Sequence, residues 1–167
     1  MRGRYRFKRE LPSDGSALEG LPLQLMIIVL VLAIGVPAVY TSMRYYDTQN
    51  VIQKVENQVE FIEQKAKMLY TYGAGNSDVI KVDLEPGVFR EVEYMELCNE
   101  TFRDMIRWKI DDGQTGMHFL GDNISLVSGS DEPLRLGSGT HQLRLETRRG
   151  DPFGTGEDTL YVEISSA

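Results

Sequence analysis

Few residues of this chain have the types and spacing that catalysis requires. The single cysteine, Cys98, has no second thiol with which to form a disulfide or a CxxC site, and the only histidines, His118 and His141, lie in different segments. We therefore expect Cys98 to be a small apolar core residue and not a nucleophile. The sequence has no GxSxG, HExxH or P-loop motif. We expect no catalytic residue, no cofactor and no bound metal, and hence a protein that is not an enzyme.

Two acidic, glycine-containing stretches have oxygen-rich side chains. Residues 150–158 (GDPFGTGED) can supply oxygen ligands to a calcium ion, but they fit no EF-hand spacing. Gly, Pro and Asp are also the ordinary residues of turns, so a solvated hairpin loop is the favoured interpretation and calcium stays an open alternative. Residues 111–113 (DDG) are likewise expected to form a turn.

Two Asn-x-Ser/Thr sequons begin at Asn99 and Asn123. Such motifs accept N-linked glycans on exported surfaces, although a motif this short also arises by chance. Both asparagines are candidate glycosylation sites.

The charge is unevenly distributed. Residues 1–20 contain five basic and three acidic side chains, residues 21–40 contain none, and the whole chain has a net charge of −7. A largely acidic exterior argues against binding nucleic acid, because such binding needs a basic surface that displaces counterions from phosphates.

Residues 21–40 read LPLQLMIIVLVLAIGVPAVY, without a charge. As an α-helix this stretch spans about 30 Å, the thickness of the hydrocarbon core of a bilayer. We predict a single-pass membrane protein in which the basic leader, residues 1–20, stays in the cytoplasm and the C-terminus lies outside. Gly35 and Pro37 lie near the end of the span. They predict a kink or local melting, either as a flexible point in a packed helical bundle or as a kink without function.

From Thr41 to about Tyr72 the chain has no Gly and no Pro, and apolar residues recur every three or four positions. Such a seam predicts an amphipathic helix, residues 41–75, that needs a packing partner. The partner is either the protein's own globular domain or a bundle of copies of the protein. The seam residues are Ile52, Val55, Val59, Ile62, Ala66 and Leu69. Polar and charged residues occupy the positions between them, with Glu63 and Lys67 at i, i+4 spacing, and Glu56 and Glu60 are expected to be solvated.

After Asn76 the pattern changes to short alternating runs separated by Gly, Pro, Asn and Asp. About eight strands at roughly ten-residue spacing are typical of an antiparallel sandwich. The predicted fold class is therefore α+β: a long N-terminal helix followed by an antiparallel β-sandwich-like domain, residues 76–167.

The order of these segments resembles that of archaeal type IV pilin-like proteins with a class III signal peptide. The matching features are the basic leader, Gly20, the opening Leu21-Pro22-Leu23-Gln24-Leu25 of the apolar helix, its amphipathic extension and the β-rich domain. Weaker matches are the helix exit at 73–77 (GAGNS), the strand and turn at 79–88, and residues 136–143 (LGSGTHQL).

The resemblance implies that a prepilin peptidase cuts between Gly20 and Leu21. It further implies a major or minor pilin, assembled into an extracellular surface filament through residues 21–72 with copies of itself or other pilins. The β-rich domain is then displayed at the cell surface, where adhesion is one use. The alternative is a monomeric, membrane-tethered binding or sensory domain.

Overall fold

The computed structural model describes residues 15–98, 104–121, 124–130, 132–152 and 154–167, with side chains from residue 22 onward. The chain divides into two compact units, Met1–Ser42 and Met43–Ala167. The second unit therefore contains the amphipathic helix as well as the strands. The predicted boundary at residues 75–76 separates segments of the sequence, and the compact unit continues across it.

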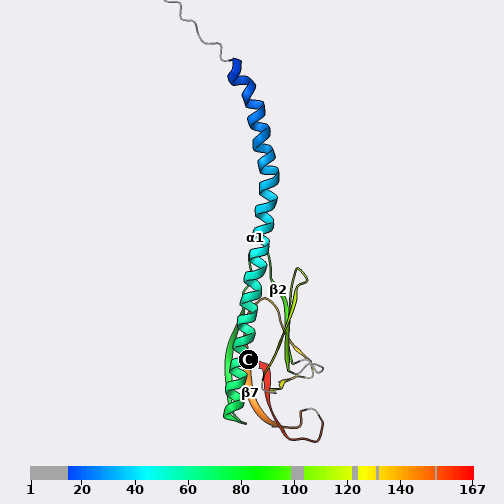
Figure 1. The fold of residues 1–167 in the computed structure, drawn as a ribbon. Helices are drawn as coiled ribbons and strands as arrows, with labels where there is room; N and C mark the ends of the chain where they lie inside the picture. Colours follow the sequence, from blue (N-terminus) through cyan, green and yellow to red (C-terminus); the bar gives the residue numbers. More distant parts are fainter. Residues whose placement is uncertain (1–14, 99–103, 122–123, 131, 153) are drawn as a thin grey trace, which may run out of the picture. The chain divides into compact units, whose positions relative to one another are not determined.

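A single α-helix, α1, extends over Gly15–Tyr72 (Figure 1). It ends where the sequence predicts, because Gly73 and Gly75 adopt φ angles of +85° and +89° that residues with a side chain rarely adopt. The side-chain amide of Asn76 donates to the carbonyls of Tyr72 and Gly73, which satisfies acceptors that the helix end leaves open.

Within the described residues, eight strands follow the helix, at the positions that the alternating pattern indicates. They are β1 (Ser77–Leu84), β2 (Val92–Leu97), β3 (Met105–Ile110), β4 (Thr115–Phe119), β5 (Leu126–Ser128), β6 (Leu134–Leu136), β7 (Gly139–Gly150) and β8 (Thr159–Ser166). They form two four-stranded sheets, with the orders β1-β7-β8-β5 and β4-β3-β2-β6. The predicted α+β class with a β-sandwich-like domain is confirmed.

One strand pair departs from the antiparallel prediction. β5 pairs with β8 in parallel, with Leu126 opposite Val162 and Ser128 opposite Ile164. The other strand pairs are antiparallel. β5 has only three residues, and its Leu126 is buried in the core that both sheets share.

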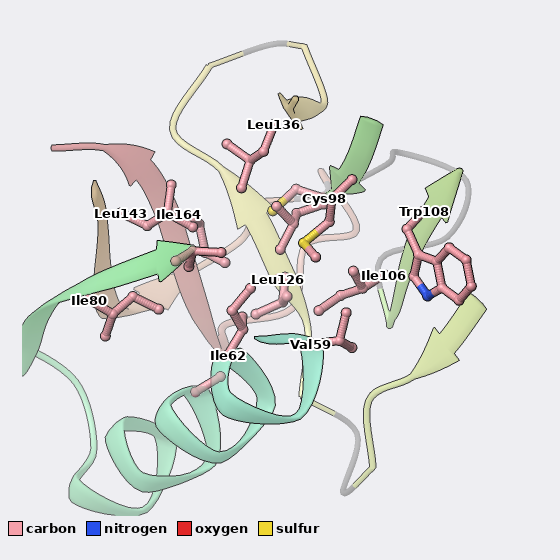
Figure 2. Close-up of a cluster of buried hydrophobic side chains, with 14 of the residues drawn as sticks. Val59, Ile62, Ile80, Cys98, Ile106, Trp108, Leu126, Leu136, Leu143 and Ile164 are labelled. Carbon is pink, nitrogen blue, oxygen red and sulfur yellow. The ribbon is translucent and has the colours of Figure 1, made fainter. Parts of the chain in front are cut away.

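The seam of α1 packs into this core (Figure 2). Val55, Val59, Ile62 and Leu69 are at most 3% exposed, and they share one cluster with side chains from both sheets. Val51 is fully buried where the sequence analysis placed Ile52, and Ile52 is half-buried against the cluster. Burying one aliphatic side chain of this size contributes about 1.5–3 kcal/mol. The seam therefore packs against the protein's own domain, which is one of the two partners that the sequence analysis left open.

Cys98 also belongs to the core, as expected. Burial raises the pKa of its thiol to about 12, so the thiolate that a nucleophile needs does not form near neutral pH. The two histidines are engaged elsewhere: Nε2 of His118 lies 2.7 Å from Glu63, and Nε2 of His141 lies 2.8 Å from the carbonyl of Gly137.

A glycine and an indole meet across β3 and β4. Trp108 is 6% exposed and opposite Gly116 in the register of the two strands. A Cβ added to Gly116 would overlap the six-membered ring of Trp108. Because Gly116 has no side chain, the indole of Trp108 can occupy this space and cover the end of the core.

Candidate functional site: an exposed apolar helix

The first part of α1 exposes a continuous apolar surface. Its large apolar side chains from Leu23 to Val39 are each 52–70% exposed. Contiguous apolar surface of this extent marks a site of contact with lipid or protein. By length and composition, this helix is able to cross a membrane.

The helix stays α-helical through Pro37, so of the predicted kink or local melting, local melting is wrong. Proline removes one backbone donor from the ladder. Two hydroxyl groups one turn later hydrogen-bond to backbone carbonyls of this region: Thr41 Oγ1 donates to the carbonyl of Pro37 at 2.8 Å, and Ser42 Oγ donates to that of Ala38 at 2.9 Å. Both are bonds from a hydroxyl to the carbonyl four residues earlier, a common position for Ser and Thr in helices, whereas the carbonyl that lacks its usual donor because of Pro37 is that of Ala33.

Gly35 leaves an open notch on the same segment. A Cβ added there would meet no atom within 4 Å, and the residue does not require a positive φ. The described part of the chain therefore gives no internal reason for glycine at this position. Small residues allow close approach of a second helix in lipid, and Ala33 and Ala38 lie within one turn of Gly35.

The predicted helix-packing residues thus separate into two groups. Val55, Val59, Ile62, Leu69 and the half-buried Ile52 pack within the second unit, whereas Gly35 and Pro37 lie on the exposed apolar segment. The predicted processing residues, Gly20 and Leu21, both lie within the helical backbone of α1. The two candidate glycosylation sites, Asn99 and Asn123, lie outside the described residues.

Glu63 forms a polar junction between α1 and the end of β4. The sequence analysis noted its i, i+4 spacing with Lys67 but missed its contacts with β4. Its side chain is 14% exposed. One carboxylate oxygen lies 2.7 Å from Nε2 of His118, and the other accepts the N–H of Gly121 at 3.1 Å and lies 3.0 Å from Nζ of Lys67. Partial burial raises the pKa of Glu63, but these donors outweigh it and hold the pKa at about 2.

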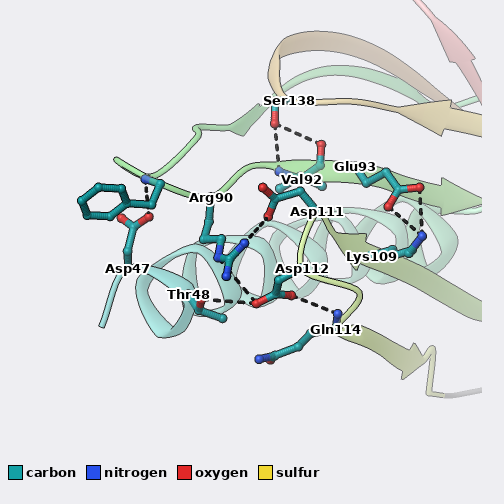
Figure 3. Close-up of polar contacts among 11 residues, drawn as sticks. Asp47, Thr48, Arg90, Val92, Glu93, Lys109, Asp111, Asp112, Gln114 and Ser138 are labelled. Atoms are coloured by element: carbon teal, nitrogen blue, oxygen red, sulfur yellow. Dashed lines mark hydrogen bonds and ion pairs between the residues drawn. The ribbon is translucent and has the colours of Figure 1, made fainter. Parts of the chain in front are cut away.

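Asp47 forms a second junction, which the sequence analysis also missed (Figure 3). Its buried carboxylate accepts the backbone N–H groups of Val88 and Phe89, at 2.8 and 2.7 Å. Burial raises the pKa of Asp47, and the backbone hydrogen bonds, including one from Arg90, lower it below its ordinary value. A Cβ on Gly87 would lie 2.5 Å from the Asp47 carboxylate, so this approach requires glycine.

The turn between β3 and β4 is held near Asp47 by Thr48 and Arg90. Arg90 lies 3.7 Å from carboxylate oxygens of both Asp111 and Asp112, and Thr48 donates to Asp112 at 3.4 Å. Asp112 also accepts the N–H of Gln114, as a turn residue does. These groups hold the turn and the loop at Arg90 to the helix.

In the 150–158 loop, the Asp151 carboxylate accepts hydrogen bonds from residues of the same loop. Asp151 accepts the N–H of Thr155 at 2.9 Å, its hydroxyl at 3.2 Å, and the N–H of Gly156 at 2.6 Å. Backbone donors that point at a carboxylate are typical of a turn. Among the described residues, no group of three or more His, Cys, Asp or Glu is placed to hold a metal ion.

Comparison with protein-family models, with curated proteins and with solved structures finds no match to this chain.

Proposed function

We propose that this protein is a structural subunit, a major or minor pilin, of an archaeal type IV pilus-like surface filament that assembles through the apolar segment of α1. One observation carries the proposal. The large apolar side chains of residues 23–39 are exposed throughout, whereas the amphipathic seam that follows packs against the protein's own core. The apolar segment is thus the surface that still requires a partner.

The polar sites support a structural role over a catalytic one. Glu63 and Asp47 accept hydrogen bonds that fasten loops to α1. A domain braced in this manner suits a filament subunit, which must keep its shape under tension.

The charge pattern supports the topology that the function requires. The basic leader stays in the cytoplasm under the positive-inside bias, and the acidic remainder is exported. Removal of residues 1–20 by a prepilin peptidase then frees an uncharged helix that can leave the bilayer and enter a filament core. The β-rich domain is displayed at the surface, where it serves contact with other cells or surfaces.

The proposal is tested by shearing cells and measuring the protein in the sheared material and in the membranes. Gly35→Leu fills the notch on the apolar segment without adding polarity, so we expect it to leave the membrane fraction unchanged and to remove the protein from the sheared fraction. Ile34→Leu is the matched control, since it places the same side chain one residue earlier at constant volume, and it should assemble. If wild-type protein never enters the sheared fraction, the proposal is wrong.

A monomeric, membrane-tethered binding or sensory domain is the second candidate. It is favoured by the self-sufficient core of residues 43–167, which needs no second copy to bury its seam. For a simple tether, the order of residues in the apolar segment is immaterial as long as the segment remains long and apolar. Gly35→Leu then behaves like Ile34→Leu, with both confined to the membrane fraction.

A further inference from the structure

Strand β4 forms one edge of its sheet, and among the described strands it pairs with β3 alone. Just beyond this pair, Leu120 donates its backbone N–H to the carbonyl of Asp104. In an antiparallel ladder, hydrogen-bonded positions recur at every second residue, and the residues between them direct their backbone groups to the other side. The N–H and carbonyl groups of Thr115, Met117 and Phe119 therefore point away from β3, toward the open edge.

The other edge strands are protected in ways that β4 is not. Natural sheets protect their edges with short strands and with charged side chains. β5 and β6 have three residues each, and β1 carries Asp78, Lys81 and Asp83. β4 (TGMHF) has five residues without Asp, Glu, Lys or Arg, and its Met117 and Phe119 side chains are 62% and 61% exposed. An edge of this kind can pair with an added strand.

A groove lies between α1 and the inner side of β4. It has a volume of about 320 Å³, and its lining residues are Glu56, Val59 and Glu60 of α1, Trp108 of β3 and residues 116–118 of β4. His118 is bound to Glu63, and the lysines of α1 in the second unit pair with carboxylates other than Glu56 and Glu60. A strand added to β4 lies about 4.8 Å from it, which brings its inward side chains to these two carboxylates.

The outer side of β4 is apolar and lies beside cations. Successive side chains of a strand alternate between its faces, so Met117 and Phe119 lie on the face opposite the groove. In the register with β3, Arg107 lies opposite Met117. Lys109 lies two residues further along β3 and pairs with Glu93. An added strand with a basic side chain on this face is repelled by Arg107, whereas an apolar side chain packs on Met117 and Phe119.

We propose that the open edge of β4 binds an extended peptide segment of a partner protein, which pairs as an added strand and alternates basic and apolar side chains. The basic side chains face Glu56 and Glu60, and the apolar ones lie on Met117 and Phe119. Charge complementarity favours this occupant over the β4 edge of a second copy, because β4 itself brings no Lys or Arg to the two glutamates. The proposal concerns the displayed domain, and it holds for a filament subunit and for a tethered domain alike.

The test uses the full-length protein in detergent micelles and a short, fluorescently labelled peptide that alternates lysine and valine, with binding measured by fluorescence anisotropy. One control peptide has glutamate in place of lysine. A second is methylated on the backbone nitrogens of one edge, so it keeps its charge but cannot complete the ladder. We expect the lysine peptide to bind and both control peptides to bind at least several-fold more weakly.

Two variants locate the site on the protein. Met117→Pro removes one outward N–H and leaves the ladder with β3 intact, whereas Met117→Val changes the side chain but keeps that N–H. The double variant Glu56→Gln, Glu60→Gln removes the two charges, and Glu157→Gln, an exposed residue of the loop between β7 and β8, is its control. Folding of each variant is checked by denaturant unfolding, followed by the emission of Trp108.

We expect Met117→Pro to bind the peptide several-fold more weakly than Met117→Val, and the double variant to bind several-fold more weakly than Glu157→Gln. Absence of binding to the wild-type protein, or equal binding of the lysine and glutamate peptides, overturns the proposal. Equal binding by the two Met117 variants also overturns it. If Met117→Pro does not fold, the methylated peptide decides whether the backbone edge is used. Wild-type dimers that Met117→Pro converts to monomers, without peptide binding, assign the edge to a second copy and refute the proposed partner.

Discussion

Replacing Glu63 by glutamine isolates the energetic value of the junction between α1 and β4. The change keeps the shape of the side chain and one oxygen acceptor, but it removes the negative charge that faces His118 and Lys67. The pKa of this carboxyl falls from 4.5 to about 2 in the fold. At about 1.36 kcal/mol per pH unit, this difference corresponds to at most about 3.4 kcal/mol of stability at neutral pH.

The expected loss is smaller than this ceiling, because glutamine can still accept the N–H of Gly121. We expect Glu63→Gln to lower the free energy of unfolding by about 1–3 kcal/mol at pH 7. The effect should also depend on pH in a defined direction. A carboxyl whose pKa is lower in the folded chain stabilises the fold above the unfolded pKa and loses this contribution as the pH falls toward the folded pKa. For Glu63 the window is from about 4.5 down to about 2.

The assay is denaturant unfolding of the full-length protein in detergent micelles, followed by tryptophan fluorescence. Trp108 is the only tryptophan and is 6% exposed, so its emission reports on the core beside β4. Glu60→Gln is the control, since Glu60 is an exposed glutamate one turn away on the same helix, and it should change stability by less than about 0.5 kcal/mol. Equal effects of the two substitutions, or an unchanged acid profile in Glu63→Gln, would refute this account of the junction.

Three further predictions follow from the core and from the leader. Gly116→Ala should destabilise the domain by about 1–3 kcal/mol because its Cβ overlaps the indole across the strand pair, whereas Gly137→Ala, with open space around it, should be tolerated in the same unfolding assay. Val59→Asp should unfold the domain, since an unpaired carboxylate in this fully enclosed position costs several kcal/mol, and Glu56→Lys on the exposed face should have little effect on the unfolding midpoint. Gly20→Val should leave the leader attached, and the mass of the mature N-terminus measures this; native protein that begins at residue 1 or 2 contradicts cleavage.

The positions of the helix and strands were predictable because local patterns determine them. The 3.5-residue spacing of the seam located the buried face of α1, and the Gly73–Asn76 segment located its end. Alternating residues between turn-forming clusters located the eight strands. The identity of the helix's partner was not predictable, since a seam describes one surface and carries no information about what covers it.

The polar junctions were missed for a related reason. Periodicity assigns a charged residue to the solvated face, and Glu63 lies 55 positions before its partner His118. Asp47 likewise acts on backbone groups more than 40 positions later, and backbone N–H groups leave no mark in the sequence. The parallel pairing of β5 with β8 depends on tertiary packing in the same way, because β5 has only three residues.

The most direct test of the filament proposal is electron microscopy of surface material sheared from cells that carry this gene and from cells that lack it, with an antibody against the β-rich domain. The account predicts filaments decorated along their length, or at defined points for a minor pilin, in the first sample and no decorated filaments in the second. Antibody confined to membrane fragments, with undecorated filaments in both samples, would contradict it.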